Sequence, residues 1–398
     1  MFKVTFSFED GSMVETFANA GDNLLEVARS ANVAIDAPCS GNGACGKCRV
    51  QLKSGELESK KTLHISDEEY QAGWRLSCCS KISADVNVLV PDIASAYKSR
   101  MKVADLSSKE EIAIFENAKS DIQLAGIELK NSLEVVDVLM DVPSLDDTMP
   151  DNERLTRALR KYLNINRVRI PYVVLKKLPD VLRENNFAVK CVIRATSDDM
   201  YVYDIFGKDE DVVIGGLAID IGTTTVSAVL INMENGEILA KSSAGNGQIR
   251  FGADVINRIV ESQKPGGQKK LQDAVIKETI NPMIHEMCKS AKFPKDHIYR
   301  MCMASNTTMN HLFAGINADP LRTEPYIPAF FKTNSLFASD VGVDINKDAH
   351  IIMAPNIGSY VGGDITAGTL VSQIWNRPEF SLFIDLGTNG ELVFGNSD

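Results

Sequence analysis

The chain has 398 residues and a formal net charge of −11, with 44% hydrophobic and 24% charged residues. This composition is typical of a soluble globular protein of two to four domains, and the acidic balance argues against nucleic acid or an anionic membrane as a partner. No apolar run approaches the ~18 residues that cross a bilayer, and the N-terminus lacks the apolar stretch of a signal peptide, so we expect a cytoplasmic protein with reduced thiols.

Residues 1–95 predict one domain built around a hairpin and a helix. Strand-like alternation on both sides of a turn predicts the hairpin, and helical spacing follows it. The expected elements are strands at 3–8 and 14–17, a helix at 24–31, and further strands at 50–52 and 86–90.

Four cysteines in this domain have the spacing of iron–sulfur ligands. Cys39, Cys45 and Cys48 form the pattern C-x5-C-x2-C in a glycine-rich loop, and Cys78 follows at long range. Four thiolates in this order suit a [2Fe–2S] cluster, and the glycines let backbone N–H groups approach the sulfur atoms. The first gap resembles the adrenodoxin-type spacing. We therefore predict a β-grasp [2Fe–2S] ferredoxin domain with these four cysteines as metal ligands.

Other interpretations of the cysteines are less favoured. Zinc sites usually pair two short C-x2–4-C knuckles, and a disulfide framework is unusual in an acidic chain of this length without a secretion signal. Cys79 is an alternative to Cys78 as the fourth ligand, although residues 75–77 have the form that precedes the last ligand in ferredoxins. We expect three isolated cysteines to be buried and inert: Cys191, Cys288 and Cys302.

Residues 96–127 predict a charged linker with a helix at 110–118, and residues 128–207 predict a small α+β middle domain. Asp151 is the expected N-cap of a helix whose apolar face carries Leu155, Leu159 and Tyr162. The other expected elements are strands at 133–140, 187–196 and 200–204 and a helix at 172–184. No chemical motif stands out, so the sequence assigns no function to the middle domain.

An internal repeat dominates residues 208–398. Residues 217–225 and 382–390 each contain an apolar run that ends in Asp-x-Gly-Thr and precedes another apolar strand. We expect each run to be a strand buried on both faces, and the terminal aspartates, Asp220 and Asp385, then need a cation or a donor. The glycine and threonine of each turn suit phosphate oxygens, so two facing turns would hold a triphosphate with its Mg²⁺. For either copy alone, an ordinary strand–turn–strand is the alternative.

The two copies resemble the phosphate-1 and phosphate-2 motifs of the ATPase superfamily of actin, sugar kinases and heat-shock chaperones. That superfamily is built from two ribonuclease-H-like α/β units. The resemblance implies that Asp220 and Asp385 are catalytic residues, which organise the metal and the attacking water. It also implies that residues of both turns bind the phosphates of ATP: Gly222, Thr223, Thr224, Thr225, Gly387, Thr388, Asn389 and Gly390.

Further motifs make the chain similar to one family, the RACE proteins, which are reductive activators of corrinoid-dependent enzymes. These motifs are residues 218–225, 251–259, 305–312, 361–365 and 384–391, and the resemblance covers the whole chain. It implies that an external low-potential donor reduces the cluster, and that one electron then passes to cobalt(II) of a corrinoid protein in an ATP-dependent step that regenerates cobalt(I).

The family resemblance also implies four further nucleotide-binding residues: Asn306, Gly362, Gly363 and Asp364. The residues alone leave two other interpretations open. Asn306 also suits the start of a capped helix, and residues 362–364 also suit a turn into a helix.

The chain departs from the superfamily at its C-terminal end. The second ATPase half normally continues past phosphate-2 with an adenosine motif, whereas this chain stops shortly after a strand. We therefore expect residues 208–398 to form only the first part of an ATPase domain, without the adenine-binding residues.

Three other functions stay open. The main alternative is a ferredoxin-type electron carrier with a non-hydrolysing, ATPase-like docking domain. An activator of another radical or dehydratase enzyme would hold a [4Fe–4S] cluster between two subunits, and a kinase would need a general base that the sequence does not single out. The sequence also leaves open whether the protein forms a homodimer.

Overall fold

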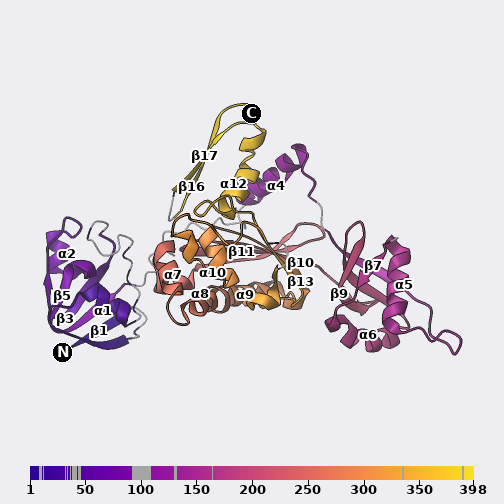
Figure 1. The fold of residues 1–398 in the computed structure, drawn as a ribbon, viewed down its shortest axis with the longest axis horizontal. Helices are drawn as coiled ribbons and strands as arrows, with labels where there is room; N and C mark the ends of the chain where they lie inside the picture. The colour runs from indigo at the N-terminus through magenta and orange to yellow at the C-terminus, as the bar shows by residue number, and fades with distance from the viewer. Residues whose placement is uncertain are drawn as a thin grey trace.

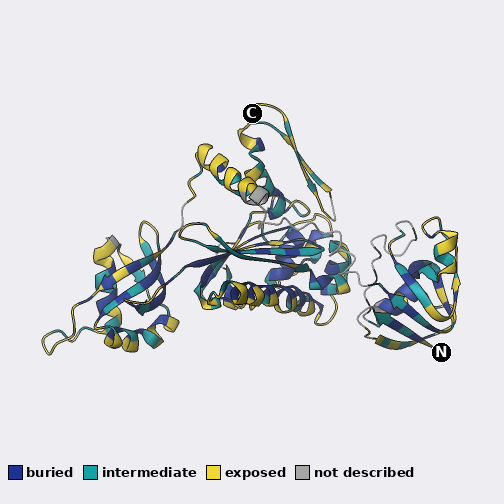
Figure 2. Cartoon of the chain, turned by 180° about the vertical axis from the view of Figure 1, so that it is seen from behind, coloured by how far each residue is buried: buried dark blue, intermediate teal, exposed yellow. Residues whose placement is uncertain are grey.

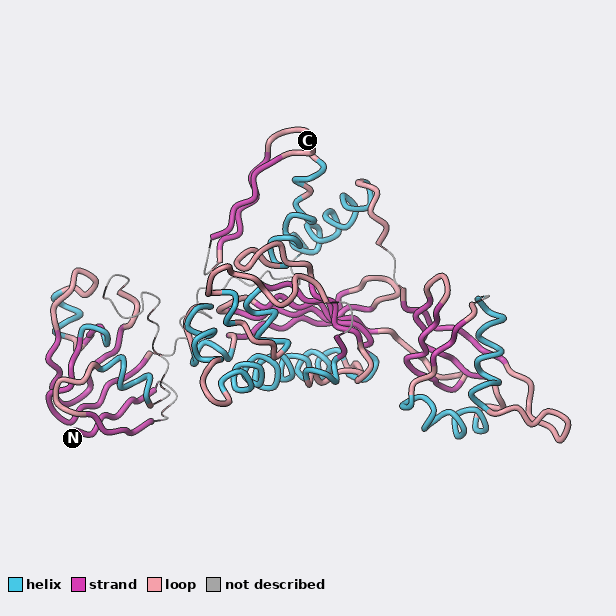
Figure 3. Tube along the Cα trace, viewed as in Figure 1, coloured by secondary structure: helices cyan, strands magenta, loops and turns pink. Residues whose placement is uncertain are grey.

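The computed structural model contains a ferredoxin-like domain, a helix followed by a small α+β domain, and a larger central domain (Figures 1 and 3). It describes residues 1–398 except 9–10, 12, 32, 34, 36, 38–42, 44–45, 92–108, 130–131, 164, 334–335 and 388–389. In the part of the chain so described, no helix has the length and apolar character to span a membrane. The predicted α+β multidomain fold is confirmed.

The N-terminal domain is a five-stranded sheet in the order β2-β1-β5-β3-β4. β1 pairs antiparallel with β2 and parallel with β5, which in turn pairs antiparallel with β3. Alternate residues of these strands, such as Val4, Phe6 and Val88, are buried against Leu24 of the first helix. The elements are β1 (Phe2–Phe8), β2 (Met13–Ala18), α1 (Leu24–Ser30), β3 (Arg49–Ser59), α2 (Asp67–Gln71), β4 (Trp74–Leu76) and β5 (Ser80–Val90).

The middle domain is a four-stranded sheet in the order β6-β8-β9-β7, with α5 and α6 packed on it. Leu155 and Leu159 of α5 are buried as predicted, but Tyr162 is exposed and the prediction for it is wrong. The last turn of α5 opens onto a groove beside β6 that charged side chains also line, among them Arg157 and Lys161, so the Tyr162 ring is not enclosed by the core. The helix α4 (Lys109–Leu124) precedes this domain and lies apart from it (Figure 1). The elements of the domain are β6 (Leu133–Leu139), α5 (Asp151–Leu163), β7 (Arg167–Arg169), α6 (Tyr172–Glu184), β8 (Ala188–Ala195) and β9 (Asp199–Gly207).

A small shared core joins the middle domain to the central domain. Leu133 and Tyr203 of the middle domain pack with Ile214 and Tyr299 of the central one. The Tyr299 hydroxyl donates to the carboxylate of Asp204 at 3.2 Å. This apolar contact with a satisfied polar group inside it fixes the two domains to each other.

The central domain is a six-stranded sheet in the order β12-β11-β10-β13-β15-β14. β10, β11 and β12 form an antiparallel meander, and β13 and β15 run parallel to β10, which is the expected ribonuclease-H-like arrangement. α8 and α9 lie along one face of the sheet (Figure 1). The elements are β10 (Gly215–Ile221), β11 (Thr225–Asn232), β12 (Ile238–Gly245), α7 (Val255–Ser262), α8 (Gly267–Val275), a π-helical turn (Ile276–Ile280), α9 (Asn281–Ala291), β13 (Ile298–Ser305), α10 (Thr307–Ala314), β14 (Leu336–Phe337), α11 (Ala338–Val341) and β15 (His350–Met353).

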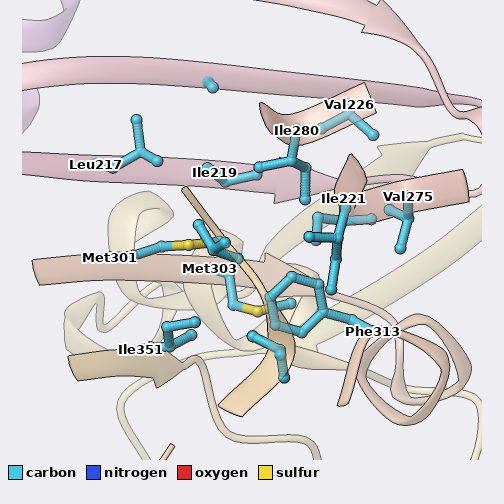
Figure 4. Packing of buried hydrophobic residues seen from close by; sticks show 14 of the residues in the cluster. Leu217, Ile219, Ile221, Val226, Val275, Ile280, Met301, Met303, Phe313 and Ile351 are labelled. Atoms are coloured by element: carbon cyan, nitrogen blue, oxygen red, sulfur yellow. The ribbon is translucent and has the colours of Figure 1, made fainter. Parts of the chain in front are cut away.

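Only one face of β10 is buried. Leu217, Ile219 and Ile221 point into a core that includes the methionines of β13 (Figure 4). Ala218 and Asp220 on the other face are exposed, so the expectation of a strand buried on both faces is wrong. The exposed face lies opposite α8 and α9, on the side of α12 and the C-terminal hairpin (Figure 1).

The same geometry corrects one prediction about the cysteines. Cys191 and Cys288 are buried as expected, but Cys302 is exposed. Cys302 stands opposite Ala218 in the pairing of β13 with β10. It therefore shares the open face of the sheet.

The second copy of the repeat lies in a separate two-stranded hairpin of β16 (Ser381–Leu386) and β17 (Gly390–Gly395). Leu382, Ile384 and Leu386 are exposed, so the expectation that this strand is buried is also wrong (Figure 2). The hairpin is covered on one face by α12 (Gly363–Ser372). Contact is close there, since a Cβ on Gly368 would lie 2.3 Å from the Phe383 ring.

Candidate cluster and nucleotide sites

Strand pairing brings two of the predicted cluster ligands together. Cys48 directly precedes β3 and Cys78 follows β4, and these two strands pair through Arg49 and Leu76. The backbone N–H of Ser77 donates to the Cys48 carbonyl at 2.8 Å. The two sulfur atoms consequently lie 3.1 Å apart. Cys39 and Cys45 lie outside the described residues.

Cys79 stays close enough to compete with Cys78. Its sulfur lies 3.6 Å from that of Cys78, and a Cβ on Gly43 in the cluster loop would lie 3.3 Å from it. Cys78 is buried next to Cys48, whereas Cys79 is half-buried. Burial therefore favours Cys78 as the ligand, and the pairing geometry agrees.

The surroundings of these thiols suit a cluster. Burial and the neighbouring Cys48 raise the pKa of the Cys78 thiol, so a cation such as iron is needed to hold it as thiolate. The hydroxyl of Ser77 is buried without a hydrogen-bond partner among the described residues, and a cluster sulfur would accept from it. Gly46 adopts a φ of +66°, and a Cβ there would meet His64 at 2.6 Å. The loop therefore requires glycine at this position.

Residues 222–225, which we call the first phosphate turn, are tightly held between the end of β10 and the start of β11. The N–H of Gly222 donates to the Thr225 carbonyl at 2.8 Å. The Asn246 side chain donates to the Gly222 carbonyl at 2.9 Å, and the Asn246 N–H donates to the Thr224 carbonyl at 2.8 Å. These bonds fix residues 222–225 as one short rigid turn at the end of a strand.

Asn306 performs two tasks at this turn. Its side chain caps α10 by accepting from the Met309 N–H at 2.9 Å, and its Nδ2 donates to the Thr223 hydroxyl at 3.3 Å. The capped-helix interpretation is thus correct, and it also places Asn306 beside the turn. Because β13 runs parallel to β10, both strands end at the same edge of the sheet.

The N-terminus of α12 lies against the same edge. A Cβ on Gly362 would lie 2.3 Å from Cα of Asn306, and one on Gly363 would lie 2.5 Å from the Ala354 carbonyl oxygen. Asp364 stands in the first turn of the helix, where its carboxylate accepts from the Ile365 N–H at 2.9 Å. The turn into a helix predicted at residues 362–364 is correct, and it brings Asp364 toward the first phosphate turn.

Carboxylates from four elements, β10, α12, β16 and β17, influence one another near the first phosphate turn. Asp220 keeps contact with solvent, but lost hydration and the nearby carboxylates of Asp364 and Asp385 raise its pKa to about 6. Reduced hydration also raises the pKa of Asp364, with Asp385 adding to it. The pKa of Glu391 is raised in the same way, by lost hydration and then by Asp364 and Asp385. Asp220 of the first repeat and Asp385 of the second therefore lie close enough to interact electrostatically, and the region between the two repeats is the candidate nucleotide cleft.

These carboxylates form a concentration of negative charge that a cation would balance. Among the described residues, no three acidic, histidine or cysteine side chains converge closely enough to hold a metal ion by themselves. Mg²⁺ usually keeps several waters and takes its remaining ligands from carboxylates and phosphates. Gly387 is exposed and Gly390 begins β17, while Thr388 and Asn389 fall outside the described residues.

Three family models match the chain in order. They are a 2Fe-2S iron-sulfur cluster binding domain over residues 7–83, the RACo linker region over 122–212 and the RACo middle region over 215–377. A solved structure of a reductive activator for corrinoid, iron-sulfur protein is 33% identical, with a TM-score of 0.61, over 100% of this chain and 62% of that one. This chain belongs to the RACE family.

Two curated relatives match the chain over different lengths. The corrinoid activation enzyme RamQ of Eubacterium limosum is 28% identical over 377 residues, which are 94% of this chain and 56% of RamQ. The chain thus spans little more than half the length of that RACE relative. One component of the Na(+)-translocating NADH-quinone reductase of Actinobacillus succinogenes is 35% identical over 91 residues, which are 22% of each chain.

Sequence reasoning missed three residues of the candidate nucleotide site. Asn246 and Arg258 hold the first phosphate turn from beneath, and Glu391 joins the carboxylates of the cleft. Arg258 lies in one of the motifs that resemble the RACE family, residues 251–259. The sequence could not show, however, that this arginine is buried.

Proposed function

We propose that this protein is an ATP-dependent reductive activator that returns the cobalt of a corrinoid protein from cobalt(II) to cobalt(I). The observation that carries the proposal is the likeness of the whole chain to a reductive activator for corrinoid, iron-sulfur protein. The order of a cluster-binding domain, a linker region and a middle region along one chain supports it.

In this proposal Cys39, Cys45, Cys48 and Cys78 hold a [2Fe–2S] cluster, which supplies single electrons when bound. The sulfur–sulfur distance of 3.1 Å between Cys48 and Cys78 supports the assignment of that pair. The orphaned hydroxyl of Ser77 supports it further, because a buried donor needs an acceptor. An external low-potential donor would reload the site between turnovers.

The two repeats would hold Mg·ATP between them. The turn at residues 222–225, with Asn306 beside it, would bind phosphate oxygens on one side, and residues 387–390 on the other. Asp220 and Asp385 would bind Mg²⁺ through its waters and orient the water that attacks the γ-phosphate. The raised pKa of Asp220 supports this role, because a cation between the carboxylates relieves their repulsion.

Coupling to ATP answers an energetic problem. Reduction of cobalt(II) by a ferredoxin-like donor is uphill, and each ~59 mV for one electron corresponds to ~1.4 kcal/mol. A nucleotide shifts such an equilibrium only if its bound state changes the affinity for one redox or coordination state of the partner. Closure of the two repeats around ATP would supply that change.

Calorimetric titration of the anaerobic protein with Mg·ATP, together with iron and sulfide analysis, tests the nucleotide and cluster sites. The proposal predicts two irons and two acid-labile sulfides per chain and saturable binding of ATP. Cluster content without ATP binding would favour a ferredoxin-type electron carrier whose ATPase-like domain serves only for docking.

A further inference from the structure

Arg258 is a buried cation directly beneath the first phosphate turn. It belongs to α7 and its side chain is fully buried. The guanidinium donates to the Thr223 carbonyl, to the Gly252 carbonyl at 2.8 Å and to the Gln248 side-chain oxygen at 3.1 Å. A further nitrogen contact reaches the Met309 sulfur at 3.3 Å. Every one of these partners is uncharged.

No ion pair to Arg258 forms among the described residues. Asp254 is the carboxylate that acts on it, but that side chain is engaged at the start of α7, where it accepts from the N–H and the Nδ2 of Asn257, each at 2.8 Å. Burial lowers the pKa of Arg258 to about 9, so the side chain is still charged at neutral pH. A buried charge without a counter-charge is costly, and proteins normally retain one only where a ligand or partner balances it.

The hydrogen bonds also orient the turn. Asn246 draws the Gly222 carbonyl inward at 2.9 Å, and Arg258 draws in the next carbonyl, that of Thr223. In a trans peptide the C=O and the following N–H point in opposite directions. Two successive carbonyl oxygens, which would repel an anion, are thereby turned away from the cleft. Successive N–H groups that point to one side form an anion-binding concavity.

We propose that Arg258, aided by Asn246, is a positioning residue for phosphate: it turns the carbonyls of the first phosphate turn inward and places a balancing positive charge behind them. No carboxylate among the described residues pairs with Arg258, and the phosphates of the bound nucleotide would supply the counter-charge. This inference rests on the proposed nucleotide site and names the part of the ligand, the polyphosphate, that the turn selects.

The test uses the full chain and two probes, Mg·ATP and Mg·tripolyphosphate, with dissociation constants measured by calorimetry. Arg258→Gln keeps hydrogen-bond donors but loses the charge, and Arg258→Lys keeps the charge but loses the planar fork. Arg250→Gln is the matched control, since Arg250 is a half-exposed neighbour that pairs with Glu278. Melting temperatures of all variants report on structural damage separately from affinity.

We expect Arg258→Gln to raise the dissociation constants of both probes at least tenfold and Arg258→Lys to recover most of the lost affinity. The dissociation constants of Arg250→Gln should stay within twofold of the wild-type values. Equal affinity in Arg258→Gln and the wild type, or equal loss in the glutamine and lysine variants, overturns the inference. If Arg258→Gln does not fold, Asn246→Ser tests the inference instead. Serine still accepts a hydrogen bond from the Gln248 N–H, but it is too short to reach the Gly222 carbonyl. Weaker tripolyphosphate binding supports the inference and unchanged binding overturns it. A wild-type protein that binds neither probe contradicts the proposed nucleotide site instead.

Discussion

At the scale of single residues, the choice between Cys78 and Cys79 determines how the cluster is held. The Cys78 sulfur is 3.1 Å from that of Cys48, whereas the Cys79 sulfur is half-buried and 3.6 Å from Cys78. We predict that Cys78→Ser lowers iron content to a small fraction of the wild-type value and removes the visible absorption of a [2Fe–2S] cluster. Cys79→Ser, the adjacent control, should retain both. The reverse pattern would assign the fourth ligand to Cys79.

Asp220 gives the protein a predictable dependence on pH. Because reduced hydration, Asp364 and Asp385 raise its pKa from 3.8 to about 6, the folded state holds the proton more tightly than the unfolded state. The resulting stabilisation is present below pH 3.8 and is lost as the pH rises through 6. We predict that Asp220→Asn melts about 2–4 °C above the wild type at pH 7.5, and that this difference shrinks toward zero at pH 4.

The exposed Asp146 of the middle domain provides the control for this measurement. Asp146→Asn should leave the melting temperature unchanged at both pH values. A stabilisation by Asp220→Asn that is the same at pH 4 and pH 7.5 would contradict the crowding of carboxylates in the cleft.

At the scale of elements, the approach of α12 to the edge of the central sheet brings Asp364 to the candidate nucleotide cleft. A Cβ on Gly362 would lie 2.3 Å from Cα of Asn306 and 2.5 Å from the Ser305 carbonyl oxygen, both backbone atoms that cannot move aside. We predict that Gly362→Ala costs about 1–3 kcal/mol in free energy of unfolding, the usual range for overpacking. It should also weaken ATP binding, because Asp364 moves with the helix.

Gly358→Ala is the matched control for this substitution, because nothing lies within 4 Å of its Cβ position. Denaturant unfolding and calorimetric titration of the two variants make the comparison. Equal behaviour of Gly362→Ala and Gly358→Ala would show that the contact between α12 and Asn306 is not needed.

Local sequence patterns predict a helix or strand well where one face of it packs against a single hydrophobic core. The helix expected at 172–184 is α6, and the hairpin and helix of the first domain are present with small changes at their ends. Tyr162 and the apolar run at 382–386 fail for the opposite reason. Each has the pattern of a buried position, but Tyr162 lines an open groove, and Leu382, Ile384 and Leu386 lie on the exposed face of their hairpin.

Some residues of the candidate site can likewise be predicted from the sequence, and others cannot. The cysteine spacing and the two Asp-x-Gly-Thr turns indicate their chemistry through the residue types alone. The structure brings Cys48 next to Cys78 and Asp220 toward Asp385. The role of Arg258 depends instead on the burial of its side chain beneath the first phosphate turn. An arginine on an amphipathic helix normally predicts a solvated face, so only the fold reveals a buried one.

At the scale of the whole molecule, the helix that carries Arg258 also lies beside the ferredoxin domain (Figure 1). A cavity of about 200 Å³ separates Val33, Ile35 and Ala37 of that domain from residues that include Phe251 and Val260. The first phosphate turn and residues near the cluster loop are thus connected through one short helix. Such a path lets nucleotide binding affect the position of the redox domain, provided the two arrangements differ in affinity for ATP.

The central claim is that nucleotide chemistry drives a single electron toward cobalt. The direct measurement follows cobalt(I) formation in an anaerobic corrinoid partner protein, with the reduced activator and with Mg·ATP, a non-hydrolysable ATP analogue or no nucleotide. Our account predicts cobalt(I) formation at least tenfold faster, or to a higher final level, with Mg·ATP than under the other two conditions. The same rate and the same final level under all three conditions would contradict it.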